Sequence, residues 1–408
     1  MIKDSTNVSN NSDSGQELIN LIFNDEDART ILNCFQCGMC TASCPVSEQF
    51  PFKTHQMVRL GGLGSNEDII LESTLRYCLT CRTCQEYCPQ GVDFIEFVKL
   101  ARAALVKKGI EPEETHDGIL TIISELQANK SNGFKFEDIE IPEGYNVSKK
   151  GKVAYFFGCL PILDVVFDYL NVNLNKILKD SIKILNKVLD EPPVIIDNIK
   201  CCGHDSLWKG HFDTFKKLAE HNVEKIKKAG IQTIITTCAE CYRTLKLDYP
   251  KYVKGADFEV LHISELISNE LKKNKELFNT PTPKKVTFHD SCRLGRHMKL
   301  YDQPRTILQN MEKMGVIFNE MERNKEYAPC CGVSCFINCN DLSKALQVDR
   351  LTEAKNVADS MILSCPKCQI HYKCILHEKR EEKSADIDLE ILDLTSLIAK
   401  LMGLENQG

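Results

Sequence analysis

The cysteines are the residues of this sequence best suited to chemistry. The chain has 21 cysteines among 408 residues. Eight of them form two runs with the same spacing, Cys-x2-Cys-x2-Cys-x3-Cys-Pro: Cys34, Cys37, Cys40 and Cys44, then Cys78, Cys81, Cys84 and Cys88. Three thiolates spaced in this way can bind one face of a cubane [4Fe–4S] cluster, and the fourth reaches a partner cluster. The two runs therefore predict two cubane clusters.

This is the spacing of bacterial ferredoxins, and it assigns the ligands across the two runs. One cluster takes Cys34, Cys37, Cys40 and Cys88, and the other takes Cys78, Cys81, Cys84 and Cys44. The alternatives are a structural zinc site or eight buried free thiols, but zinc takes four ligands, in pairs rather than in two identical runs. A helix predicted between the runs indicates an α-helical ferredoxin domain. Clusters with a thiolate on every iron suit electron relay.

Ten further cysteines form a second pattern that occurs twice. Its order is Cys…Cys-Cys-Gly…Cys-x2-Cys, with Cys159, Cys201, Cys202, Cys238 and Cys241 in the first copy and Cys292, Cys330, Cys331, Cys365 and Cys368 in the second. The repeated order indicates an internal duplication, and the glycine permits a tight backbone bend near a metal. Five thiolates exceed the needs of one cubane. Each copy therefore predicts an unusual iron–sulfur cluster, or a cubane with one redox-active thiol.

The pattern resembles the CCG domain of the heterodisulfide reductase family. The matching segments are Cys-Phe-Gln-Cys-Gly-Met-Cys-Thr-Ala-Ser-Cys-Pro at 34–45, Cys-Ala-Glu-Cys-Tyr-Arg-Thr at 238–244 and His-Asp-Ser-Cys-Arg-Leu-Gly-Arg-His at 289–297. Over about residues 30–375 the chain resembles the fused D-type subunits, which join a C-type ferredoxin part to a B-type CCG part. The resemblance implies a non-cubane [4Fe–4S] cluster on the five cysteines of each CCG copy.

The resemblance also implies a reaction, the splitting of a disulfide such as CoM-S-S-CoB into two thiols in a cleft shared by the two copies, as in methanogenesis. The cubane clusters would refill the non-cubane clusters one electron at a time. The sequence has no nucleotide fingerprint such as GxGxxG, so the electrons must come from a partner, either a membrane cytochrome b or a soluble flavoprotein.

Two other functions fit part of the pattern. Some CCG proteins are non-catalytic relay subunits of membrane-associated 2-hydroxyacid or glycerol-3-phosphate dehydrogenases and pass electrons to a quinone. Two complete five-cysteine sets favour catalysis, because a relay has little need for both unusual sites. A redox-sensing thiol protein is the weakest alternative, because it would not need eight ferredoxin ligands.

The remaining catalytic candidates lie beside the CCG cysteines. His204 and His289 are candidate proton donors, because histidine titrates near neutral pH. The segment after the second pair reads Val-Ser-Cys-Phe-Ile-Asn-Cys-Asn at 333–340, where the relatives often carry glycines. It adds Cys335 and Cys339 as candidate participants, whereas Cys374 is interpreted as a structural thiol.

Three basic residues lie close to the second copy in the sequence. Arg293, Arg296 and His297 follow Cys292 directly. They either hold a carboxylate, sulfonate or phosphate of a substrate or form a solvated basic face.

Composition excludes several classes of protein. Lys+Arg 51 against Asp+Glu 57 gives a net charge of −6, and the charges are interspersed, which argues against a nucleic-acid partner. The N-terminal sequence lacks the regions of a secretory signal, and no run approaches the roughly 18 apolar residues of a membrane span. We therefore expect a cytoplasmic protein that reaches a membrane only through a partner subunit.

The elements alternate in a way that predicts an α+β multidomain fold, with an N-terminal α-helical ferredoxin domain followed by two α/β CCG domains with short parallel sheets. The predicted parts are a disordered tail 1–15, the ferredoxin domain 16–128, a linker 129–151, the first CCG domain 152–280 and the second CCG domain 281–408. The predicted helices are 66–76, 94–107, 165–189, 211–229 and 341–357. The predicted strands are 152–157, 194–196, 231–237, 285–288 and 361–363. A Gly-rich turn is predicted at 61–64, and an amphipathic stretch that packs on a neighbour at 389–401.

Overall fold

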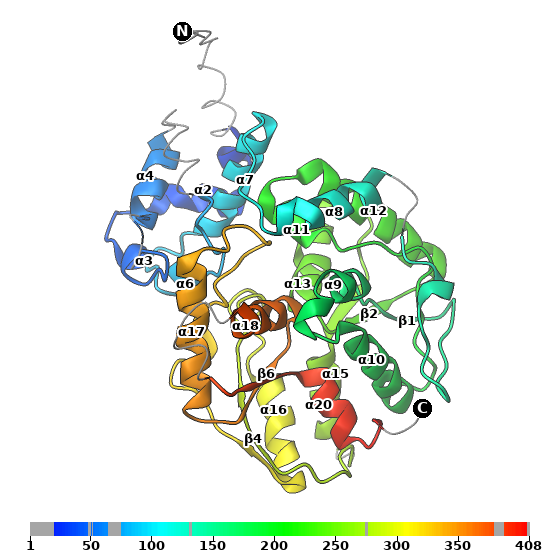
Figure 1. The fold of residues 1–408 in the computed structure, drawn as a ribbon. Helices are drawn as coiled ribbons and strands as arrows, with labels where there is room; N and C mark the ends of the chain where they lie inside the picture. Colours follow the sequence, from blue (N-terminus) through cyan, green and yellow to red (C-terminus); the bar gives the residue numbers. More distant parts are fainter. Residues whose placement is uncertain are drawn as a thin grey trace, which may run out of the picture.

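The computed structural model describes residues 20–47, 50, 52–63, 75–129, 133–273, 276–378 and 387–405. A helical N-terminal part packs against two α/β halves, each with its own sheet (Figure 1). The tail predicted at 1–15 and most of the helix predicted at 66–76 lie outside these residues. In the described part of the chain, no helix combines the length and the apolar character that crossing a bilayer requires.

The N-terminal part surrounds the two ferredoxin-type runs with short helices. Its central element is the helix α7, which spans the predicted residues and begins where the Asp93 side chain accepts a hydrogen bond from the Glu96 N–H. The elements of this part are α2 (Glu26–Arg29), η1 (Thr30–Asn33), α3 (Met39–Ala42), α4 (Thr54–Leu63), α6 (Thr83–Glu86), α7 (Phe94–Lys107), η2 (His116–Gly118), α8 (Ile119–Asn129) and η3 (Phe136–Asp138). Helix α8 of this part packs against α12 (Phe212–Ala229) of the first half.

The turn predicted at 61–64 is wrong for its first three residues. Helix α4 continues through Leu63, and Gly61 is buried against the ring of Phe97 on α7, where an added Cβ would overlap that ring. The glycine therefore permits a close approach of two helices rather than a bend in the chain.

This close approach predicts opposite effects for neighbouring glycines. Gly61→Ala should lower the free energy of unfolding by about 1–3 kcal/mol, because the buried Phe97 ring has no room to move. Gly62→Ala is the matched control, because its Cβ would meet only Leu32 at 3.8 Å and alanine favours the helix by up to about 1 kcal/mol. Denaturant unfolding of the anaerobic protein measures both. Equal stabilities would contradict the packing argument.

Each half contains a parallel sheet, and the two sheets share one topology. The strand orders are β1-β2-β3 and β5-β4-β6-β7. The strand predicted at 194–196 is reduced to single bridges that join Val194 to Ala154 and Ser148, so Val194 lies beside β1 as β5 lies beside β4. The strands are β1 (Val153–Tyr155), β2 (Thr233–Thr236), β3 (Glu259–His262), β4 (Lys284–Phe288), β5 (Val316–Phe318), β6 (Ser360–Leu363) and β7 (Glu390–Asp393).

The helix predicted at 165–189 is divided, because Asn171 and Asn173 adopt left-handed backbone angles (φ 51° and 52°) that interrupt it. The helical elements of the first half are α9 (Leu160–Val166), η4 (Asp168–Leu170), α10 (Leu174–Val188), α11 (His204–Lys209), α12 (Phe212–Ala229), α13 (Ala239–Arg243), η5 (Thr244–Asp248), α14 (Tyr249–Tyr252) and α15 (Ile263–Lys272). Those of the second half are α16 (Asp302–Met311), η6 (Glu312–Met314), η7 (Lys325–Tyr327), α17 (Asp341–Lys355), α18 (Pro366–Glu378) and α20 (Leu394–Leu401).

The two halves pack through equivalent helices. In each half, one helix precedes the cysteine pair (α10 or α16), and one follows the last strand (α15 or α20). Helix α20 packs against α10, and α15 packs against α16, so the interface has an approximate two-fold symmetry. The stretch predicted to pack at 389–401 forms β7 and α20.

Candidate functional site

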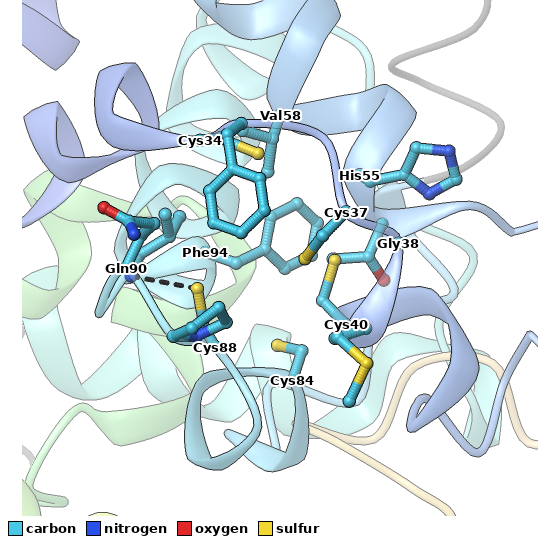
Figure 2. A pocket seen from close by; sticks show the side chains of 15 residues that line it. Cys34, Cys37, Gly38, Cys40, His55, Val58, Cys84, Cys88, Gln90 and Phe94 are labelled. Carbon is cyan, nitrogen blue, oxygen red and sulfur yellow. Dashed lines mark hydrogen bonds between the residues drawn. The ribbon is translucent and has the colours of Figure 1, made fainter.

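The first ferredoxin-type group lies near the surface of the N-terminal part. Cys34, Cys37, Cys40 and Cys88 line one pocket, together with Cys84 (Figure 2). Cys37 is exposed, and Cys34, Cys40 and Cys88 are partly exposed. The positive φ of Gly38 (81°) turns the chain between two of these thiols. An all-sulfur donor set of this kind fits an iron–sulfur cluster.

The second group lies deeper, between the first group and the second half. Cys78, Cys81 and Cys84 are buried, and Cys44 lies close enough for its charge to act on Cys78 and Cys84. Burial raises the pKa of the Cys78 thiol to about 12. Thiolates at this site therefore need a compensating positive charge, which bound iron supplies.

In the first half, the five cysteines line a single pocket at the carboxyl ends of the strands. They are Cys159, Cys201, Cys202, Cys238 and Cys241. The Sγ atoms of Cys202 and Cys241 lie 3.5 Å apart. Gly158 has a φ of 62°, and a Cβ at this position would lie 2.8 Å from the Sγ of Cys241. Only glycine lets the backbone approach the thiols so closely.

In the second half, the five cysteines form a chain of thiol contacts. Cys292 contacts Cys330, Cys330 contacts Cys331, Cys331 contacts Cys368, and Cys368 contacts Cys365. Cys365 in turn contacts Cys238 of the first half. The two five-cysteine sets therefore meet at the interface between the halves.

A buried ion pair lies beside this junction. Lys367 of the second half pairs with Glu240 and Asp205 of the first half. Glu240 and Lys367 occupy the same position of the two Cys-x2-Cys motifs, so equivalent residues of opposite charge face each other. Burial raises the pKa of Glu240 to about 7. The sequence patterns do not single out these three residues, although an alignment of the two copies shows opposite charges at positions 240 and 367.

The basic residues near the second copy do not form a solvated face. Arg293, Arg296 and His297 are all buried, which corrects the interpretation as a solvated basic face. Arg293 donates to the carbonyl of Thr80 (2.5 Å) and to its hydroxyl (2.7 Å), and Arg296 donates to the carbonyl of Cys81 (2.6 Å). These side chains fix the loop between Cys78 and Cys81 onto the second half.

This docking brings the ferredoxin-type cysteines close to the CCG cysteines. Cys81 lies near enough to Cys330 for their charges to interact. The only tryptophan, Trp208, is completely buried where the three parts meet. It contacts Lys99 of the N-terminal part, Arg243 of the first half and Arg293 of the second half, each at 4.5–5.2 Å from its ring.

The two histidines predicted as proton donors lie in different surroundings. His204 lines the pocket of the first half. Its Nε2 accepts a hydrogen bond from Arg293 (3.0 Å), and its Nδ1 lies 2.7 Å from the Thr244 hydroxyl. Burial lowers the pKa of His204 well below its usual range, as it does for His289. His289 lies between Arg350 and Tyr372 and does not line this pocket.

The three cysteines outside the sets divide into two locations. Cys335 is buried beside the charged junction, where burial raises its pKa to about 11 and Lys367 and Asp205 act on it. Cys339 and Cys374 instead lie near Lys344, whose Nζ is 3.3 Å from the Cys374 Sγ. Only Cys335 is therefore placed where the two halves meet.

We expect the stability of the fold to depend on pH through a histidine that the sequence did not single out, His262. His262 is buried, caps α15 and contacts the carbonyl of Thr237, next to Cys238. Burial lowers its pKa to about 4, against about 6.5 in an unfolded chain. Below pH 6.5 the unfolded state binds the extra proton. The contribution of His262 to the free energy of unfolding is therefore complete above that pH and falls by about 2 kcal/mol at pH 5.

Denaturant unfolding of the anaerobic protein at pH 7 and pH 5 measures this loss. His262→Asn keeps a capping side chain and should reduce the difference between the two pH values by about 2 kcal/mol. An unchanged difference would exclude His262 as its source.

The comparisons with known proteins agree with this arrangement. Residues 30–92 match the 4Fe-4S dicluster domain, and residues 153–246 and 286–373 match the cysteine-rich CCG domain. The fold and the cysteine sets thus define an iron–sulfur redox protein with one dicluster domain and two CCG domains. The chain belongs to the family of the D-type subunits of CoB–CoM heterodisulfide reductase.

Three relatives illustrate the range of similarity. The D-type subunit of the dihydromethanophenazine:CoB–CoM heterodisulfide reductase of Methanosarcina acetivorans is 31% identical over 401 residues, which cover 91% of this chain and 94% of the relative. Its counterpart in Methanosarcina barkeri is 29% identical over 400 residues, with the same coverage. The EtfAB:quinone oxidoreductase of Syntrophomonas wolfei is 27% identical over 277 residues, or 65% of this chain and 37% of the relative.

Proposed function

We propose that this chain is the catalytic iron–sulfur subunit of a heterodisulfide reductase-type complex, which reduces a disulfide such as CoM-S-S-CoB to two thiols. The observation that carries the proposal is the meeting of the two five-cysteine sets at the contact between Cys238 and Cys365. A disulfide bound there has one set on each side. The two Methanosarcina relatives, named for the CoB–CoM heterodisulfide, support the same substrate class.

The cysteine groups would hold four clusters. The two groups of four fit cubane [4Fe–4S] clusters, and the two groups of five fit non-cubane [4Fe–4S] clusters. All the candidate ligand atoms are sulfur, and Gly158 leaves space beside Cys241 that any side chain would fill. When bound, such clusters supply electrons one at a time. The contacts among the groups suggest an order, from the exposed first group through Cys81 and Cys330 to the junction of the halves.

The reaction consumes two electrons and two protons for each disulfide. The S–S bond breaks, and each sulfur takes one electron and one proton to become a thiol. Glu240, with a pKa raised to about 7 by burial, can hold a proton beside the junction at neutral pH. His204 lines the same pocket, with Arg293 holding its ring. Lys367 supplies positive charge near a departing thiolate.

The electron donor would dock over the first ferredoxin-type group. Cys37 is exposed there, and the neighbouring Phe35 and Met39 expose 59% and 48% of their surface. Exposed apolar side chains around an exposed redox group suit a partner interface. The partner would be a membrane cytochrome b or a soluble flavoprotein, because this chain offers no nucleotide fingerprint.

A relay function is the second candidate. The similarity to an EtfAB:quinone oxidoreductase covers 65% of this chain, so the same domains also occur in a protein named for quinone reduction. In such a function the chain would pass electrons from its partner to a quinone and break no bond.

Electron paramagnetic resonance of the oxidised, anaerobically purified protein distinguishes the two candidates. Four clusters predict about 16 iron atoms per chain. A new paramagnetic signal on addition of coenzyme M or coenzyme B thiol would support disulfide reduction. About 16 iron atoms per chain, without a new signal on addition of either thiol, would favour the relay function. A total of about 8 iron atoms would contradict clusters on the CCG cysteines.

A further inference from the structure

A cavity of about 190 Å³ lies apart from the cysteine sets, between the first half and the edge of the second sheet. It is lined by residues of α10, β7, α18 and α20. A cavity of about 150 Å³ can hold a benzene ring, so this one has room for a small organic molecule. Eleven of its sixteen lining residues are polar or charged, although apolar atoms contribute most of the lining surface.

Two buried acceptor atoms of the cavity lining have no hydrogen-bond partner in the described part of the chain. They are the Oε1 of Gln369 and the Oδ2 of Asp393; the two residues are 4% and 3% exposed. The other polar atom of each side chain is occupied: the Nε2 of Gln369 donates to the carbonyl of Val172 (2.8 Å), and the Oδ1 of Asp393 accepts from the N–H of Thr395 (2.7 Å). Both side chains are thus fixed with one acceptor unsatisfied, an arrangement that costs free energy unless a donor arrives.

The equivalent position of the first half is satisfied without a ligand. His262 caps the helix after the last strand there, as Asp393 does in the second half. Both of its ring nitrogens have partners, the hydroxyl of Ser264 at 2.7 Å and the carbonyl of Thr237 at 3.3 Å. The unsatisfied acceptor is therefore particular to the second half and not a property of the repeated fold.

Four lysines provide positive charge around the same cavity: Lys176, Lys284, Lys373 and Lys400. Lys176 and Lys284 pair with carboxylates that also line it, Glu405 and Glu390. Lys373 donates to the carbonyl of Asn171. Among the residues that the structure describes, neither Lys373 nor Lys400 has a carboxylate within ion-pair distance. Glu390 lies near enough for its charge to act on Lys373 and Lys400, but in the described part of the chain neither lysine forms an ion pair, and both line the same cavity as the two acceptors without donors.

We infer that this cavity binds a small carboxylate that also carries N–H or O–H donors, of the class of amino acids and hydroxy acids. The carboxylate meets Lys373 and Lys400. The donor groups meet the Oε1 of Gln369 and the Oδ2 of Asp393. This binding is independent of the disulfide chemistry, because no cysteine lines the cavity.

Calorimetric titration of the anaerobic holoprotein tests the inference with three probes. L-Serine offers an ammonium group and a hydroxyl, D-glycerate offers hydroxyls only, and acetate offers the carboxylate alone. We expect serine or glycerate to bind at least tenfold more tightly than acetate. The preferred probe identifies the donor as ammonium or hydroxyl.

Two variants and one control locate the binding. Asp393→Asn keeps the cap of α20 but replaces the free acceptor by a donor, and Lys400→Gln removes one cation. Each should weaken binding of the preferred probe by about tenfold, which corresponds to one charge-assisted hydrogen bond. Lys228→Gln, at an exposed lysine of α12, should leave the affinity unchanged.

Three results would overturn the inference. Absence of heat with serine and with glycerate would mean that the cavity holds water only. Equal affinity for acetate would mean that the two acceptors play no part. An unchanged affinity in both Asp393→Asn and Lys400→Gln, at unchanged unfolding midpoints, would place the binding elsewhere.

Discussion

Replacing Cys238 by serine is expected to abolish disulfide reduction, with a loss of at least 100-fold in rate, and to change the iron content of the protein. Cys238 belongs to the first five-cysteine set and is its contact with Cys365. A serine hydroxyl is a weak ligand for iron where a thiolate is required. The variant should therefore lose up to about four iron atoms per chain. Iron analysis and reduction of CoM-S-S-CoB with a reduced viologen dye measure both effects.

Cys374→Ser is the matched control for this prediction. Cys374 is also buried, but it contacts Lys344 and Glu378 rather than either set. This variant should keep both its iron and its activity. If Cys238→Ser retained full iron and full rate, the first set would not be part of the reaction centre. If both variants lost iron, the effect would reflect general destabilisation of the fold.

The second large effect is expected for Arg293→Met. Arg293 lies in the second half and connects all three parts. Its guanidinium donates to Thr80 of the N-terminal part and to His204 of the first half. Removing the guanidinium deletes three buried hydrogen bonds from a charged donor, each worth about 1.5–3 kcal/mol, although the carbonyl and hydroxyl of Thr80 keep contacts to His297 and Ser334. We expect the variant to lose several kcal/mol of stability. Electron transfer from the ferredoxin-type groups to the CCG groups should slow as the docking loosens.

The emission of Trp208 reports this change directly, because it is the only tryptophan and Arg293 lies 4.5 Å from its ring. Its emission should shift to the red when water reaches the junction. Arg293→Lys keeps the charge but not the forked geometry, so it should fall between the wild type and Arg293→Met. A wild-type spectrum and stability in Arg293→Met would show that this arginine does not hold the three parts together.

Much of the fold was predictable because local patterns determine it. Helix α7 spans the predicted residues, and strands β1, β2, β4 and β6 overlap the predicted ranges with ends that differ by at most two residues. Each of these strands is a short apolar run bounded by turn residues. Strands β3, β5 and β7 were missed. Strands β3 and β7 mix apolar with polar or charged side chains, and the apolar strand β5 has only three residues. The pairing of all three depends on neighbours distant in the sequence.

The candidate site was predictable in its sulfur chemistry but not in its charges. Spacing and order alone single out the four cysteine groups, because two runs repeat the ferredoxin spacing and the two five-cysteine sets repeat one order of residues. The burial of Arg293 and Arg296 follows from carbonyls more than 200 residues away, which no local pattern reveals. The pairing of Glu240 with Lys367 likewise needs the relative placement of the two halves.

That pairing bears on how such a chain could have arisen. In a symmetric dimer of a single CCG domain, residues near the two-fold axis face copies of themselves. A glutamate at the position of Glu240 would then oppose a glutamate, and a lysine at the position of Lys367 would oppose a lysine, which is unfavourable for buried charges. Attraction across the axis requires two copies that mutate separately. Two copies joined in one chain can diverge into complementary, non-interchangeable halves, as the residues Glu240 and Lys367 show.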